Sequence, residues 1–148
     1  MTSKVLGELA SLRDVDLPAA GDPVTRQMPA TPDEVGPARR WFRACMQHWP
    51  DTPTADAVAV FSEIAGNAAR HTNGTVRVAV WVTPAEVICG VRDGSWRAPR
   101  LPRLWRPGEE AGRGLRIVEE LAHTWGWRRH WHGKTVWFVV LAAPAGLT

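Results

Sequence analysis

The chain has 148 residues, of which 45% are hydrophobic and 22% are charged, and its formal net charge is +3. This length and composition predict a single globular domain and exclude a disordered or low-complexity chain. No apolar run approaches the roughly 20 residues of a membrane helix, and charges at Glu8 and Arg13 interrupt any signal-peptide pattern. The two cysteines, Cys45 and Cys89, lack a CxxC spacing, which favours reduced thiols over a metal site. We therefore expect a cytoplasmic protein that does not associate with membranes.

The first half of the chain predicts a leader, one short strand and two helices. Residues 1–23 mix Leu, Asp, Pro and Gly, so we expect a short helix at most and otherwise a loosely ordered leader. Residues 24–29 fit a short strand. A helix over residues 31–50 starts with Thr-Pro and two acids and stops at Trp-Pro. The next helix, over residues 53–74, ends at Asn-Gly, which is a left-handed C-terminal signal.

The second half predicts two paired strands, a long loop, a helix and two final strands. Valine alternates over residues 75–82, and residues 87–92 form a strand that pairs back after a tight turn. Residues 96–111 are rich in Pro, Arg and Gly and lack any period, as in a lid or binding loop. A helix opens at Gly112. Two strands, over residues 125–131 and 135–141, end the fold. This order predicts an α+β two-layer sandwich with helices on one face of a largely antiparallel mixed sheet.

Glu63 and Asn67 form the first motif, on the helix predicted over residues 53–74. They are four residues apart and project from the same patch of that helix. A carboxylate and a carboxamide oxygen suit a hard cation such as Mg²⁺, which takes few protein ligands and keeps several waters. Taken alone, the pair also fits an ordinary amphipathic helix.

Two glycine-containing segments form the other motifs. Asp93-Gly-Ser follows a predicted strand, and a lone Asp-Gly is most often a turn. Gly112-Arg-Gly-Leu opens a helix, where free backbone N–H groups and the positive helix end can hold a phosphate. Each of these signals is weak in isolation.

The order of the motifs indicates a family. A Glu-x-x-x-Asn helix is followed by a strand ending in Asp93, a long loop, the Gly-x-Gly helix and a strand with Gly133-x-Thr135. This order resembles the GHKL-type ATPase superfamily (gyrase, histidine kinase and MutL-like proteins). More narrowly, it is similar to the small, actinobacterial-type relatives of anti-sigma-factor serine/threonine kinases. The resemblance implies a Bergerat-type ATP-binding fold over residues 24–143, with a leader at 1–23 and a tail at 144–148.

The resemblance also implies roles for individual residues. Glu63 matches the general base or water-orienting residue, and Asn67 matches the Mg²⁺ ligand that bridges the phosphates. Asp93 matches the acceptor for the adenine amino group, and Thr135 matches the hydroxyl that supports this aspartate, often through water. Residues 96–111 match the ATP lid. The remaining positions implied at the nucleotide are Ser95, Gly112, Arg113, Gly114 and Leu115.

One departure concerns the family's first glycine box, which reads Asp-x-Gly-x-Gly. Ser95 and Arg97 replace its two glycines here, so the loop beside the base is less free to take positive φ. We expect weaker nucleotide binding or a different closure of the lid.

The function implied is ATP-dependent regulation of transcription. The protein would transfer the γ-phosphoryl of Mg-ATP to a Ser or Thr of an antagonist protein. The partners implied are a STAS-type antagonist, a sigma factor, or both, and a second copy of the chain in a homodimer. The alternative in the same class is a nucleotide-dependent binding regulator without catalysis.

A nucleic-acid-binding protein is the competing class, because Trp125, Trp127 and Trp131 lie beside Arg128 and His130. These residues alternate on a predicted strand, so we expect the tryptophans to face the core and the basic residues to face solvent. We therefore expect no nucleic-acid partner.

Overall fold

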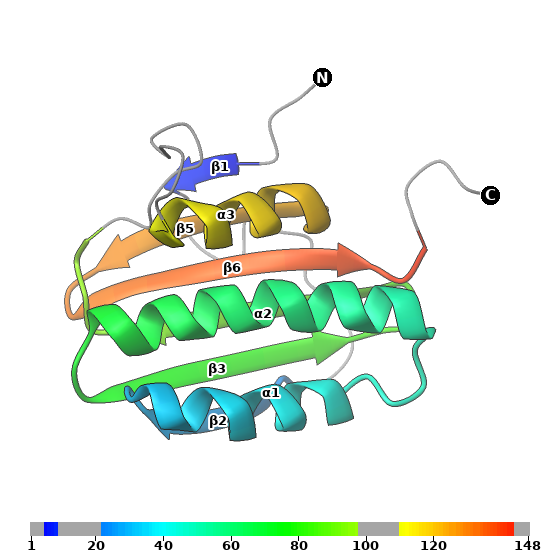
Figure 1. The fold of residues 1–148 in the computed structure, drawn as a ribbon, viewed down its shortest axis with the longest axis horizontal. Helices are drawn as coiled ribbons and strands as arrows, with labels where there is room; N and C mark the ends of the chain where they lie inside the picture. Colours follow the sequence, from blue (N-terminus) through cyan, green and yellow to red (C-terminus); the bar gives the residue numbers. More distant parts are fainter. Residues whose placement is uncertain (1–4, 9–21, 98–109, 144–148) are drawn as a thin grey trace.

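The computed structural model describes residues 5–8, 22–97 and 110–143, with side chains described for 22–97 and 116–143. Six strands form one sheet in the order β1-β5-β6-β4-β3-β2, and three helices cover one of its faces (Figure 1). The predicted two-layer α+β architecture is confirmed. The elements in chain order are β1 (Val5–Glu8), β2 (Val24–Pro29), the 3-10 helix η2 (Pro32–Glu34), α1 (Val35–Ala44), α2 (Asp51–His71), β3 (Thr75–Val82), β4 (Glu86–Asp93), α3 (Glu110–Leu121), β5 (Thr124–His130) and β6 (Gly133–Leu141).

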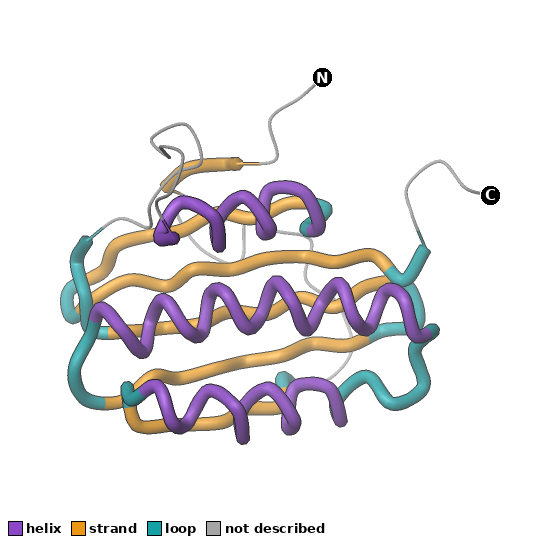
Figure 2. The backbone as a smooth tube through the Cα atoms, in the orientation of Figure 1, coloured by secondary structure: helices purple, strands orange, loops and turns teal. Residues whose placement is uncertain are grey.

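The sheet is mixed, as predicted. Strands β2, β3, β4, β6 and β5 pair antiparallel, and β1 adds in parallel beside β5. The tube in Figure 2 shows the helices in one layer and the strands in the other. The strand predicted over residues 75–82 has the bounds of β3.

The leader and the helix ends differ from the sequence predictions. Val5–Glu8 is a strand, where at most a short helix was expected. Four residues are too few to show the two-residue period of a strand, so the sequence did not predict β1. The strand forms because the exposed edge of β5 offers a hydrogen-bonding partner. Helix α2 begins at Asp51 and already ends at His71, and Gly74 turns the chain with φ +92°. Helix α3 begins at Glu110, so Gly112 lies inside its first turn.

Helix α2 lies between α1 and α3 and supplies most of the helix-side core (Figure 1). Phe61 of α2 stacks on Phe42 of α1 with ring centroids 4.4 Å apart, and Phe138 of β6 lies 6.1 Å from Phe42. All three rings are fully buried. Burial on this scale contributes about 2–3 kcal/mol per large side chain. The polar stripe of α2 is therefore held in a fixed orientation over the sheet.

The tryptophans of β5 follow the predicted alternation only in part. Trp125 and Trp127 are buried on the helix side of the sheet. Trp131 is 86% exposed, so the prediction that it faces the core is wrong. The reason is that β5 ends at His130, and alternation no longer applies in the turn that follows.

Both cysteines are free thiols. Burial raises the pKa of the Cys89 thiol well above its ordinary value, and burial also raises that of Cys45. Across the described residues, no helix combines the length and the apolar character needed to cross a membrane.

Candidate functional site

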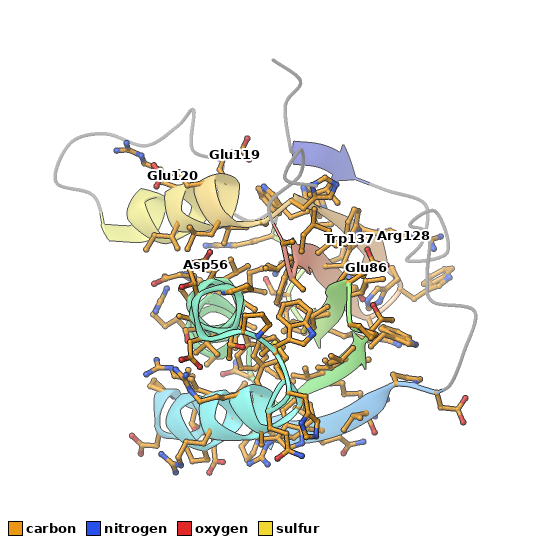
Figure 3. The ribbon with its side chains drawn as sticks, turned by 90° about the vertical axis from the view of Figure 1, so that its right-hand side faces the viewer. Asp56, Glu86, Glu119, Glu120, Arg128 and Trp137 are labelled. Carbon is orange, nitrogen blue, oxygen red and sulfur yellow. The ribbon has the colours of Figure 1, made fainter. Side chains whose placement is uncertain are left out.

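Glu63 and Asn67 lie half-buried on the side of α2 that faces α3. Asp56 is two helical turns before Glu63 on the same stripe, and it lines a groove of about 500 Å³ with Leu121 and Ala122 at the end of α3. Figure 3 shows Asp56 between the two helices. The stripe of α2 that holds Glu63 and Asn67 therefore runs along the α3 side.

The beginning of α3 lies near the end of α2. Because Asp56, near the start of α2, lies beside the end of α3, the two helices run antiparallel. The second glycine box, Gly112-Arg-Gly, is therefore at the same end of the helical layer as Asn67 and His71 (left in Figure 1). The N–H groups of the N-cap and of the first three residues of a helix have no intrahelical partner, so the amides of residues 110–112 are free of helical bonds.

Asp93, the last residue of β4, forms a buried ion pair with Lys134 of β6. The two residues are directly opposite in the antiparallel register. The Lys134 Nζ lies 3.1 Å from Asp93 Oδ1 and 3.0 Å from Oδ2, and the exposed fractions of the two side chains are 3% and 2%. The two contacts fix the carboxylate in place. Removing either partner would leave an uncompensated buried charge.

A hydrogen bond links the end of β4 to the end of α2. The Gly94 N–H donates to Thr72 Oγ1 at 3.1 Å, one residue after the helix ends. With a rise of 1.5 Å per residue, Asn67 lies about 7 Å and Glu63 about 13 Å back along the helix from Thr72. Starting from Asp93 at the end of β4, Asn67 and then Glu63 therefore follow in order back along α2.

Ser95 replaces a family glycine without requiring positive φ. Its N–H donates to Asp93 Oδ1 at 2.8 Å, and its hydroxyl accepts from the Arg97 N–H at 3.2 Å. These are side-chain turns, in which a short polar side chain takes the place of glycine's conformational freedom. Within the described part of the chain, positive φ occurs only at Gly74 and Gly133.

Thr135 does not support Asp93, which corrects the role predicted for it. It follows Lys134 on β6, so it lies on the opposite face of the sheet, and its hydroxyl is 3.4 Å from His130 Nε2. The cross-strand neighbour of Asp93 is Lys134. The family resemblance assigned the supporting role to Thr135, but the two-residue period of the strand places Lys134 on the face of Asp93.

The sequence matches the model of the histidine kinase-like ATPase domain over residues 28–140. The chain belongs to this family. No curated protein matches the sequence. The histidine kinase-like ATPase domain is an ATP-binding domain. The matched region runs from the end of β2 into β6 and includes every candidate site residue described above.

Part of the predicted nucleotide site lies outside the described residues. Positions 98–109 of the predicted lid are not described. Of Gly112, Arg113, Gly114 and Leu115, only the helical backbone is described.

Sequence reasoning missed Lys134 and Thr72. Lys134 lies on the same face of β6 as Val136, Phe138 and Val140, which are core residues on the helix side of the sheet. A lysine in a core-facing strand position signals a buried partner, and this signal was readable in the sequence. Thr72 gave no such signal, because its contact with Gly94 depends on tertiary packing.

His130 predicts a pH dependence of stability. Burial lowers its pKa, and the nearby Arg92 and Arg128 lower it further. Below the unfolded value of about 6.5, the unfolded chain binds a proton that the folded protein binds only at lower pH. The free energy of unfolding should therefore fall as pH drops below about 6.5, with no contribution above it. Urea unfolding at pH 7.5 and 5.5 should show a smaller loss of unfolding free energy for His130→Gln than for the wild type.

Proposed function

We propose that this protein binds Mg-ATP and transfers its γ-phosphoryl group to a Ser or Thr of a protein antagonist, as an anti-sigma-factor kinase does. The observation that supports the proposal best is the arrangement at one edge of the helical layer. There, Asp93 lies at the end of β4 beside the end of α2, Asn67 and Glu63 follow back along α2, and the free amides of α3 lie at the same end.

Asp93 is suited to recognise the base. A carboxylate offers about four acceptor positions, and Asp93 uses three of them, one for the Ser95 N–H and two for the Lys134 ammonium. One acceptor position is left for an adenine amino group. Because Lys134 and Ser95 fix the carboxylate, no ordering cost arises when the base binds.

Asn67 and Glu63 are suited to the phosphate end. No group of three or more His, Cys, Asp or Glu side chains that could hold a metal occurs among the described residues. A magnesium ion would therefore be held by Asn67 together with phosphate oxygens and water, which is the usual manner for this ion. The free backbone amides at the start of α3, including that of Gly112, would bind phosphate oxygens.

Mg-ATP would supply the γ-phosphoryl group and neutralise charge on it, and the protein's own groups would position the acceptor. Glu63 would accept the proton of the Ser or Thr hydroxyl or orient that hydroxyl for attack. Positioning and electrostatics supply most of the acceleration in phosphoryl transfer.

We expect Asn67→Ala and Glu63→Ala to have different effects. Loss of the amide ligand should weaken Mg-ATP binding about 10- to 100-fold, measured by isothermal titration. Loss of the carboxylate should change binding by less than about threefold but lower transfer from labelled ATP by 10²- to 10⁴-fold. Asp56→Asn, which lies on the same stripe but outside the proposed site, serves as the control. Equal binding by Asn67→Ala and the wild type would contradict the magnesium role.

The second candidate is a nucleotide-dependent regulator that binds its partner without phosphorylating it. It is favoured by one observation: within the described residues, no hydrogen bond or ion pair is found that orients Glu63 as a base. Absence of transfer to any antagonist, with Mg-ATP binding that survives Glu63→Ala, would select this alternative.

The partners that we propose are a STAS-type antagonist, a sigma factor, or both, and a second copy of the chain in a homodimer. These follow from the narrower resemblance to anti-sigma-factor kinases. A cytoplasmic location and a role in transcription regulation belong to the same proposal.

A further inference from the structure

A line of long polar side chains crosses the face of the sheet that carries no helices. The register places one residue from each of five strands side by side, perpendicular to the strands. We call this line the arginine row. Its members, from β2 to β5, are Gln27, Arg77, Arg92, Thr135 and Arg128.

Among the described residues, the row is a positive strip without a neighbouring carboxylate. Arg77 and Arg92 are directly opposite one another on adjacent strands, an arrangement that destabilises a sheet when both charges are alike. All three arginines are exposed. In strands β2 to β6, the acid on this face is Glu86, six residues before Arg92 on the same strand and about 20 Å away. No described carboxylate therefore neutralises the row.

A shallow groove of about 410 Å³ runs beside the row. Its floor is formed by the small residues Ala79 and Gly90, and Arg77 and Arg92 border it. Next to it, Trp137 is only 1% exposed and pairs with a glycine on each neighbouring strand. Figure 3 shows Trp137 and Arg128 on the side of the sheet away from the helices.

We propose that the arginine row is a docking surface for an acidic, extended segment of a partner protein. Planar guanidinium groups bind carboxylates through two parallel hydrogen bonds, and the groove gives such a segment room to lie against the sheet. Five strands at a spacing of about 4.8 Å make the row about 19 Å long, which is about six residues of extended chain. The surface goes beyond the proposed nucleotide site, which lies on the helix side.

The row fits carboxylates better than nucleic acid. Single-stranded nucleic acid is held by stacking of its bases on exposed aromatic rings. On this face Trp137 is buried and Trp81 is half-buried, so the row itself offers no open ring. Two exposed rings, Trp96 and Trp131, lie only at the Arg128 end of the row, where they line a hollow together with Arg128.

The test uses the full chain and a fluorescent 12-residue peptide of alternating Glu and Ser. We expect the peptide to bind with an affinity that falls as salt is raised, and Arg77→Gln/Arg92→Gln to weaken binding at least tenfold. Arg128→Gln should weaken it about threefold or more. The matched control is Arg40→Gln/Arg43→Gln, which removes the same charge from exposed positions on α1 and should change affinity less than twofold.

Two results would overturn the proposal. One is equal weakening by the two double variants, which would reduce the effect to net charge. The other is tighter binding of hexathymidylate than of the acidic peptide, which would assign the surface to nucleic acid. Unchanged Mg-ATP binding by Arg77→Gln/Arg92→Gln, together with an unfolding midpoint no lower than that of the wild type, would show that the loss belongs to the row.

Discussion

Replacing Asp93 by asparagine is expected to lower the free energy of unfolding by about 3–5 kcal/mol, because it leaves the ammonium of Lys134 buried without its counter-charge. The ammonium donates to both carboxylate oxygens at 3.0–3.1 Å, and both side chains are almost fully inaccessible to solvent. Urea unfolding of the two proteins at neutral pH measures the difference. A change below about 0.5 kcal/mol, which is typical of surface substitutions, would mean that the pair does not exist in solution.

A double variant separates stability from nucleotide recognition. Asp93→Asn/Lys134→Met removes both charges and fills the same space with an apolar chain, so it should regain most of the lost stability. It should still bind Mg-ATP at least tenfold more weakly than the wild type, because the adenine amino group would lose its charged acceptor and meet a neutral amide, whose NH2 group cannot accept. Lys134→Met alone would leave Asp93 buried without its partner and should be as unstable as Asp93→Asn. A stable double variant with full Mg-ATP affinity would refute the role of Asp93 in base recognition. It would not contradict the stabilising role of the ion pair in the wild type.

Gly133→Ala is expected to have the second-largest effect. Gly133 starts β6 with φ +149°, and a Cβ at this position would lie 1.9 Å from the backbone oxygen of Asp93 and 2.8 Å from the Cα of Gly94. Both are backbone atoms, so the end of β4 would have to move. We expect a loss of at least about 3 kcal/mol in unfolding free energy and weaker Mg-ATP binding, since Asp93 belongs to the displaced segment.

The control for this substitution is Gly74→Ala. Gly74 also has positive φ, at +92°, but a Cβ there would have no heavy atom within 4 Å. Only the backbone strain of about 1–2 kcal/mol should therefore appear, with no change in nucleotide binding. If the two variants were equally stable, the close approach of β6 to the end of β4 would not be a property of the protein in solution.

The elements with a clear period could be predicted from the sequence. Four alternating valines specify β3, and apolar residues at three- and four-residue steps specify α2. The same helical spacing explains why Glu63 and Asn67 lie on one stripe. Such features depend on local geometry, which the order of residues expresses directly.

Features that depend on which strands become neighbours were predicted poorly. The ion pair of Asp93 requires that β4 and β6 pair in one particular register, although 41 residues separate Asp93 from Lys134. Thr135 was chosen on family pattern, and a one-residue shift along a strand moves a side chain to the other face of the sheet. Strand β1 was missed because its pairing with β5 is also a long-range event.

The sequence by itself determined the two-layer architecture, the family and the residue types of the candidate site. These follow from periodicity and from the order of short motifs, which any reader of the chain can count. Only the tertiary structure decided that a lysine holds the aspartate, that the ends of α2 and β4 are joined through Thr72, and that three arginines share one row on the face of the sheet without helices. The physical reason is that strand register and helix docking are set by burial summed over the whole core, so the partner of a side chain is fixed by the packing of residues distant in the chain.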